Sequence, residues 1–143
     1  MNELYLDLRD FWSSFIDITQ SPPAYIKAML ESEILRDDYG TPQNTGNMFI
    51  VYEISDINFG ETAILQARIF SRIIGNPGYI FPVLHVQEQF EERLKGKPYM
   101  ITTKKGGVIM RYRGTRLLPL PADETRLGWV CGLMQYSLTN LKK

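Results

Sequence analysis

The 143-residue sequence contains a single cysteine and a single histidine. One cysteine, Cys131, excludes an intramolecular disulfide and a cysteine-based zinc site, and it fits a reducing compartment such as the cytoplasm. One histidine, His85, excludes a histidine-rich metal cage and any mechanism that needs two histidines. Both residues have mainly apolar neighbours in the sequence, so we expect each to be a packing residue. No metal or other cofactor is expected.

The chain also lacks an excess of charge and a long apolar run. Its 16 lysines and arginines balance its 16 aspartates and glutamates, so no overall field attracts nucleic acid or anionic lipid. No segment reaches the roughly 18 apolar residues of a membrane-spanning helix, and the first residues are acidic rather than basic. We therefore expect no membrane contact, and a protein that stays in the compartment where it is made.

Catalytic motifs are missing as well. Residues 104–107, Lys-Lys-Gly-Gly, share only their composition with phosphate-binding loops, and Asp37 and Asp38 lack the ligand spacing of a calcium loop. Glu88, Glu91 and Glu92 are the one acid cluster on an expected helix, and their spacing is typical of a solvated face. The sequence therefore predicts a protein that is not an enzyme.

The rest of the chain is organised around a helix expected at residues 80–94. Val83, Val86, Phe90 and Leu94 recur at helical spacing and form one apolar stripe, which predicts that this face packs on a sheet. Gly96 follows the last periodic residue, where a residue with positive φ often ends a helix.

The N-terminal segment shows two further helical patterns. Leu4, Leu8, Phe11 and Phe15 predict an opening amphipathic helix. Its apolar stripe is unusually wide, so it is either sandwiched between two layers or partly in contact with another subunit. The Ser-Pro-Pro sequence at residues 21–23 predicts the start of a second helix. The stripe of that second helix consists of Ile26, Met29, Leu30 and Ile34.

Strand patterns dominate the remainder. Residues 48–54 form a continuous apolar, β-branched run typical of a buried strand, after a loop at residues 39–47. Residues 61–72 alternate like a strand but also contain good helix formers, and we predict a strand antiparallel to the preceding one.

A β-hairpin is expected near the C-terminal third of the chain. Its strands cover residues 98–103 and 108–113, joined by a glycine-containing turn. Residues 114–125 contain two prolines and predict an extended loop or a sheet edge. Residues 127–138 predict a last long strand, in which Gly128 and Gly132 mark bulges or close approaches of another backbone.

Together these patterns predict one α+β domain over residues 1–143. We expect a small mixed, mainly antiparallel β-sheet packed against one long helix, with additional N-terminal helices. An N-terminal helical segment (residues 1–38) would precede an α/β core (residues 48–138).

The order of these elements resembles the tail terminator (tail completion) proteins of long-tailed bacteriophages. The resemblance covers nearly the whole chain, from the opening helix through the strand pair MFIVYEI and ETAILQARIFS to the hairpin and the closing strand GWVCGLMQYSL. It implies a virion protein, assembled in the host cytoplasm, that forms a hexameric ring on the last ring of tail tube protein. Such a ring stops tube growth and presents a face to the head-side connector.

Two sets of residues follow as candidate contacts for such a ring. A ring subunit needs surfaces that remain incomplete in the monomer, and DNA would meet the ring only in passage through its channel. Apolar candidates for a subunit or tube interface are Trp12, Ile16, Leu117, Leu118 and Leu120. Basic candidates for the channel or for an acidic partner are Lys104, Lys105, Arg111, Arg113 and Arg116.

Two alternatives remain open at this point. A head-closure or other neck protein of a phage would use the same kind of small ring-forming subunit. A nucleic-acid-binding accessory protein would use the basic hairpin and Tyr112, with salt-dependent affinity.

Overall fold

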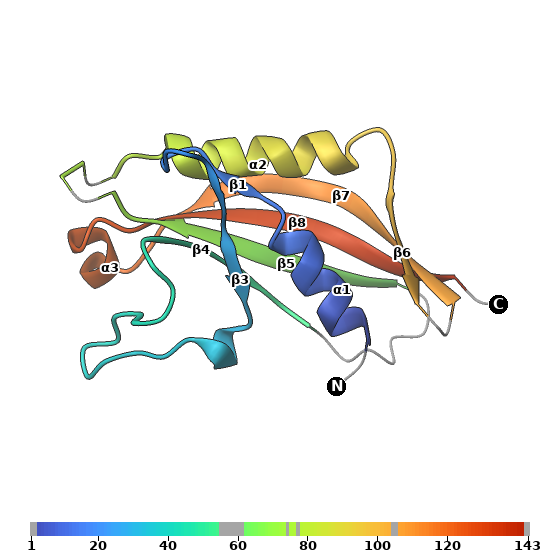
Figure 1. Cartoon of the computed structure of the whole chain (residues 1–143), viewed down its shortest axis with the longest axis horizontal. Helices are drawn as coiled ribbons and strands as arrows, with labels where there is room; N and C mark the ends of the chain where they lie inside the picture. Colours follow the sequence, from blue (N-terminus) through green and yellow to red (C-terminus); the bar gives the residue numbers. More distant parts are fainter. Residues whose placement is uncertain (1–2, 55–61, 74, 77, 104–105, 142–143) are drawn as a thin grey trace.

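The structure, a computed structural model, describes residues 3–54, 62–73, 75–76, 78–103 and 106–141. Helices and strands alternate irregularly along the chain (Figure 1). In order they are α1 (Glu3–Trp12), β1 (Ile16–Asp17), β2 (Ala24–Tyr25), β3 (Lys27–Met29), the 3-10 turn η1 (Glu31–Glu33), β4 (Met48–Tyr52), β5 (Thr62–Ser71), α2 (Phe81–Leu94), β6 (Tyr99–Thr103), β7 (Gly106–Leu118), α3 (Ala122–Arg126) and β8 (Val130–Leu141).

A six-stranded sheet dominates the fold. Its strand order is β3-β4-β5-β8-β7-β6, and every pair is antiparallel except the parallel pair of β3 and β4. Strands β5 and β8 pair over ten residues at the centre. Strands β1 and β2 form a separate two-stranded ladder. In Figure 1, α2 lies along the sheet beside β7 and β8.

Alternation along the strands divides the core between the two faces of the sheet. On β4, Ile50 belongs to the cluster that contains the residues of α1 and α2, whereas Phe49 and Val51 belong to a second cluster with Trp129. The first face is thus covered by helices. In the described part of the chain, the second face is covered at one end, by the segment that follows β3 and by the segment around α3.

The sheet curls around α1. Tyr5 of α1 contacts Tyr52 of β4 at 6.3 Å between ring centroids, and Phe11 contacts Tyr99 of the edge strand β6 at 4.9 Å. Trp12 stacks on Phe90 of α2 at 5.6 Å. The wide apolar stripe of α1 therefore lies inside the subunit, between the sheet and α2, as the first of the two interpretations expected.

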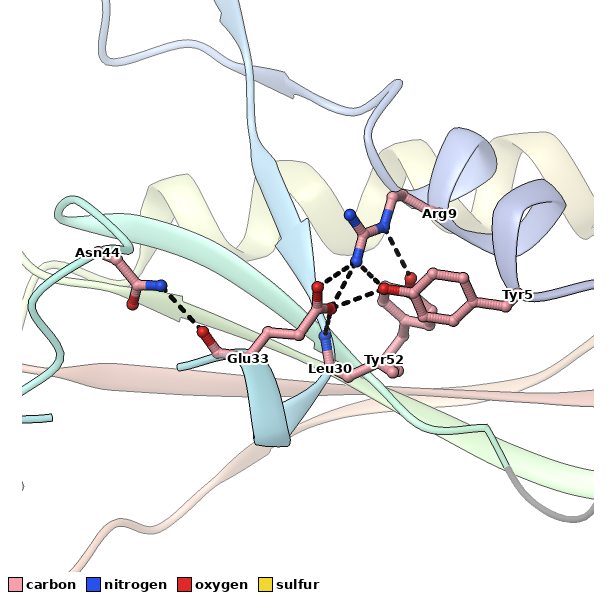
Figure 2. A network of polar contacts seen from close by, with 6 residues as sticks. All are labelled: Tyr5, Arg9, Leu30, Glu33, Asn44 and Tyr52. Carbon is pink, nitrogen blue, oxygen red and sulfur yellow. Dashed lines mark hydrogen bonds and ion pairs between the residues drawn. The ribbon is translucent and has the colours of Figure 1, made fainter. Parts of the chain in front are cut away.

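Polar contacts hold α1 to η1 and β4 (Figure 2). The guanidinium group of Arg9 pairs with the carboxylate of Glu33 and donates through Nε to Tyr52 Oη at 3.4 Å. Tyr5 Oη donates to Glu33 Oε1 at 3.0 Å, and so does the Leu30 backbone amide at 2.8 Å. One carboxylate thus joins a helix, a turn and, through Arg9, a strand. The hydrogen bond with Tyr52 raises the pKa of Arg9, so the cation persists at any ordinary pH.

Helix α2 is fixed to the sheet by one buried amide. Gln87 Nε2 donates to the carbonyls of Arg116 on β7 at 2.9 Å and of Leu133 on β8 at 3.1 Å. Gly132 makes this approach possible, because a Cβ there would stand 2.6 Å from Gln87 Nε2 and 2.5 Å from Val83 Cγ1.

The predicted fold class is wrong about the relative importance of the helices and the sheet. The protein is α+β, but a curled six-stranded sheet dominates it, the helices are short and about 24% of the chain is helical. No long helix packs against the sheet, since α2 has only 14 residues. The physical reason is that the sheet curls and so encloses its own core around the ten-residue α1.

The second N-terminal helix is also absent. Residues 24–29 form β2 and β3 instead, with β3 paired in parallel to Phe49–Val51 of β4. Ile26 and Ala28 join the helix-side cluster while Met29 joins the other. The apolar residues that we assigned to a helical stripe therefore serve both faces of an extended chain, and tertiary pairing overrides local propensity.

Most other local predictions are confirmed. The opening helix, the buried strand β4, the strand β5, the helix near residues 80–94 and the hairpin of β6 and β7 all occur, and Gly96 has the expected positive φ of 89°. The hairpin turn at 104–105 lies outside the described residues. Of residues 114–125, predicted as an extended loop or a sheet edge, 114–118 continue β7 where β6 no longer pairs with it, and residues 122–126 form α3, which was not predicted.

Candidate functional site

Among the described residues, one side of β7 is only partly paired. On one side β7 pairs with β8 from Gly107 to Leu118. On the other side it pairs with β6 only from Gly106 to Met110. Within the described ranges, no strand pairs with that other side over residues 111–118. Unpaired strand edges are surfaces on which a second chain can be built.

This open edge carries three of the basic residues singled out in the sequence. Arg111, Arg113 and Arg116 are exposed, and in the described part of the chain none of the three side chains forms an ion pair. A bulge between Tyr112 and Gly114 places Arg113 outside the ladder with β8. Charged side chains and bulges are devices that prevent indiscriminate pairing of an edge. The edge is thus unpaired by any described strand, although α2 contacts this part of β7: Gln87 Nε2 donates to the Arg116 carbonyl at 2.9 Å, and Phe90 lies 5.6 Å from Tyr112 between ring centroids.

A hollow adjoins the end of this edge, on the sheet face away from α1 and α2. Its volume is about 800 Å³, within the range of ligand and side-chain pockets. Its lining includes Phe49, Phe70, Trp129 and Cys131. Phe49 stacks on Phe70 at 5.0 Å between centroids and meets Trp129 edge-on at 5.6 Å. The hollow thus has an ordered aromatic lining.

Charges around this hollow largely satisfy one another. Glu31 accepts from Arg36 at 3.0 Å and from Arg68 at 3.3 Å, so one carboxylate bridges two guanidinium groups. Arg68 also lies 5.5 Å from the Phe70 ring centroid. Arg116 contributes a cation to the same lining, and in the described residues it has no acidic partner.

Cys131 is unsuited to nucleophilic chemistry at this position. Burial raises the pKa of its thiol to about 12, and the nearby Arg68 only partly opposes this shift. At neutral pH the sulfur is therefore a protonated, buried group, and the thiolate that would attack a substrate is absent. Packing explains the residue, as expected from the sequence.

The apolar candidates separate into core and surface residues. Trp12 is 0% exposed, so the expectation that it lies at a subunit interface is wrong: it fills the space between α1, α2 and β8. Ile16 and Leu117 are exposed. Leu118 and Leu120 are half-buried beside the hollow, where Leu120 packs on the second core cluster.

Of the remaining candidates, Lys104 and Lys105 lie outside the described residues. Leu117 and Arg116 are neighbours on the open edge, one apolar and one basic. Arg111, Arg113, Arg116 and Leu117 thus lie on the same strand, and Ile16 lies apart on β1. Alternation places Arg116 and Leu118 on the side of the hollow, with Leu120 nearby, whereas Leu117 is paired with Gly132 on the side of α2.

Sequence reasoning missed Gln87, Glu31 and Arg68. Gln87 fastens the end of β7 to α2, and Glu31 with Arg68 helps to line the hollow. Gln87 follows Val86 on the buried side of α2. A polar residue beside an apolar stripe does not by itself predict which carbonyls its side chain binds. The pairing of Glu31 with Arg68 joins positions 37 residues apart, which no local pattern reveals.

The described residues offer no constellation for metal chemistry, since no group of three or more histidine, cysteine, aspartate or glutamate side chains gathers among them. His85 is half-buried on α2 and contacts Gln89 at 3.0 Å. No helix in the described ranges is long and apolar enough to cross a membrane.

No significant match to a protein-family model, a curated protein or a solved structure is found for this chain.

Proposed function

We propose that this protein is a structural subunit of a phage virion: a tail terminator that forms a ring on the tail tube and joins it to the head-side connector. The observation that carries the proposal is the open edge of β7 over residues 111–118. This edge is exposed, carries charged side chains and lies beside an aromatic hollow. Such a surface suits a protein that binds specific neighbouring subunits. The sequence resemblance supplies the phage setting.

The energetics of such a contact are favourable. Burial of one large apolar side chain contributes roughly 1.5 to 3 kcal/mol, so a few per interface offset the cost of association. Leu117 supplies such a side chain on the edge itself, with 43% of its surface exposed. The hollow adds the aromatic side chains of Phe49, Phe70 and Trp129 to the surface beside this strand.

Assembly with the tail tube tests the proposal. We expect the purified protein to form a multi-subunit ring, alone or on addition of tail tube protein, by mass photometry and negative-stain electron microscopy. We expect Leu117→Asp to weaken this assembly roughly tenfold or more, because it removes one buried side chain and buries a charge.

Leu6→Asp is the matched control, because Leu6 is also exposed but lies on α1, away from the β7 edge. It should leave both assembly and thermal stability close to those of the wild-type protein. A wild-type protein that stays monomeric with and without tail tube protein contradicts the proposal.

The partner identifies which ring is formed. A tail terminator binds the end of the tail tube, whereas a head-closure or other neck protein binds the connector without stopping tube growth. Polymerisation of tail tube protein in the presence of this protein distinguishes them: the proposal predicts tubes of arrested length.

A nucleic-acid-binding role has one observation in its favour, the exposed arginines of β7. That role predicts affinity for DNA or RNA that falls steeply with salt, with a slope that reports the phosphates contacted. A ring subunit of neutral net charge should bind free DNA weakly under the same conditions.

A further inference from the structure

We propose that Arg111 and Arg113 on β7 of one copy form ion pairs with Glu92 and Glu88 on α2 of the next copy. This inference rests on the proposed ring and names the contact that closes it. It commits to one occupant of the β7 edge, the acidic face of a second copy of this chain.

The acidic half of the contact lies on the outward face of α2. Glu88 and Glu92 are both exposed and stand four residues apart, so their charges lie one above the other on the helix surface. Among the described residues neither has a hydrogen-bonding or ionic partner, whereas the intervening Glu91 pairs with Lys95 at 2.8 Å. Two like charges at this spacing weaken an isolated helix. Positive charges from a second subunit would offset the repulsion between Glu88 and Glu92 by attracting both carboxylates.

The basic half lies on the open edge. Three arginines elsewhere in the described chain have acidic partners. Arg9 pairs with Glu33, and Arg36 and Arg68 share Glu31. Arg111 and Arg113 have none in the same described ranges, although both are exposed on an ordered strand. The two unpaired sets therefore have opposite signs and lie on neighbouring elements, one on α2 and the other on β7.

The two sets also have comparable spacing. Four residues along an α-helix advance roughly 6 Å, which separates Glu88 from Glu92. Two residues along a regular strand advance roughly 6.6 Å, and the bulge between Tyr112 and Gly114 changes this separation at Arg113. A helix laid along β7 therefore brings the two carboxylates near the two guanidinium groups, without a fixed register. Covering a strand edge with a helix is also a recognised way of protecting it.

The geometry favours a ring over a symmetric dimer. The acidic set lies on α2, on the helix-covered side of the sheet, and the basic set lies on the part of β7 that β6 does not pair. Because each copy offers two different surfaces, the contact is head-to-tail, and it forms a closed ring when the rotation between copies closes.

Charge reversal tests this contact. The doubly substituted proteins Glu88→Arg/Glu92→Arg and Arg111→Glu/Arg113→Glu should each assemble at least roughly tenfold more weakly than the wild type, because each places like charges in contact. The chain that carries all four substitutions should recover assembly, because opposite charges face each other again. Sedimentation velocity measures the assembly, and circular dichroism confirms that every variant is folded.

Two controls separate the specific contact from a change in net charge. Asp38→Arg and Lys97→Glu each reverse an exposed charge outside the proposed contact, and both should assemble like the wild type. Each Glu→Arg adds two positive charges and each Arg→Glu removes two, so the doubly substituted proteins have net charges of +4 and −4 and the fourfold variant returns to zero. Restoration in the fourfold variant supports the contact when the paired control, Asp37→Arg/Asp38→Arg, which also has a net charge of +4, assembles like the wild type.

The outcomes distinguish this inference from the proposed function. If the wild type forms rings and the charge-reversed proteins form them equally well, the ion pairs are wrong while the ring stands. If both reversed proteins dissociate and the fourfold variant stays dissociated, the two sets do not face each other and the inference is overturned. If the wild type is monomeric under all conditions, the proposed function and this contact fail together.

Discussion

A single glycine determines how closely α2 approaches the sheet. The Cβ of an alanine at position 132 would stand 2.5 Å from Val83 Cγ1 and 2.6 Å from Gln87 Nε2, so either the helix moves or the two carbonyl hydrogen bonds of Gln87 break. We expect Gly132→Ala to lower the free energy of unfolding by about 1 to 3 kcal/mol. Urea denaturation monitored by tryptophan fluorescence measures the change.

Gly107 provides the matched control. It also lies in a β-strand without a positive φ, and a Cβ there would meet its nearest atoms at 3.4 Å. Gly107→Ala should therefore be tolerated with a change well below that of Gly132→Ala. Equal effects at the two positions would show that close packing of Gln87 is not what requires glycine.

Cys131 links stability to alkaline pH. The usual thiol pKa is 9.0, and burial raises it to about 12 in the folded protein. Between these values the unfolded chain loses a proton that the folded protein keeps, so the free energy of unfolding falls as pH rises through this window, by up to about 1.4 kcal/mol per pH unit. Below pH 9 the thiol contributes no pH dependence.

Comparison of the wild type with Cys131→Ala at pH 8 and pH 10 isolates this contribution. Buried tyrosines such as Tyr136, whose pKa is also raised by burial, titrate in both proteins and cancel. The alanine variant should lose less stability between the two pH values. Parallel losses in the two proteins contradict the assignment.

At the scale of elements, α1 depends on the turn η1. Glu33 joins Tyr5, Arg9 and the Leu30 amide, and its side chain is 35% exposed, so solvent weakens the charge interaction. We expect Glu33→Ala to cost about 1 to 2 kcal/mol and to increase hydrogen exchange in α1 more than in β5 or β8.

Glu31 lies on the same turn and supplies a control. It bridges Arg36 and Arg68, but its side chain is 56% exposed and it contacts neither α1 nor β4 through any described hydrogen bond. Glu31→Ala should leave exchange in α1 unchanged. If both substitutions loosen α1 alike, the turn as a whole, rather than the Glu33 carboxylate, holds the helix.

Helices and strands with a clear hydrophobic periodicity were predictable from the sequence. The stripe of Val83, Val86 and Phe90 identified α2, and alternation from Ala63 to Ile69 identified β5. The prediction of a helix at residues 24–29 was wrong because Ile26, Ala28 and Met29 also fit an extended chain that is buried on both faces. The helical and the extended pattern can be told apart only when the pairing with β4 is known. The same reason explains the overestimated role of the helices: curling of the sheet depends on long-range pairing.

At the scale of the whole molecule, the candidate site was predictable only in part. The run of arginines on β7 was visible in the sequence, but the openness of the edge depends on where β6 stops pairing. Trp12 was misplaced because an apolar stripe does not reveal whether a second layer covers it. The hollow is lined by residues that are far apart in the sequence, so no local sequence pattern predicts it.

The proposed ion pairs between copies predict that assembly is sensitive to salt. The chain has no net charge, so association is not opposed by overall repulsion, and exposed ion pairs are screened as ionic strength rises. We expect the dissociation constant between copies to increase from low to physiological salt, measured by sedimentation velocity. Assembly that strengthens with salt would instead indicate an apolar interface without the proposed pairs.

The central claim is that the subunit is completed by copies of itself. Native mass spectrometry of the wild-type protein counts the copies directly. The account predicts a single closed assembly of several subunits, six if the tail terminator resemblance holds, with the monomer as a minor species. A spectrum that shows only the 16.5 kDa monomer, with tail tube protein present or absent, would contradict it.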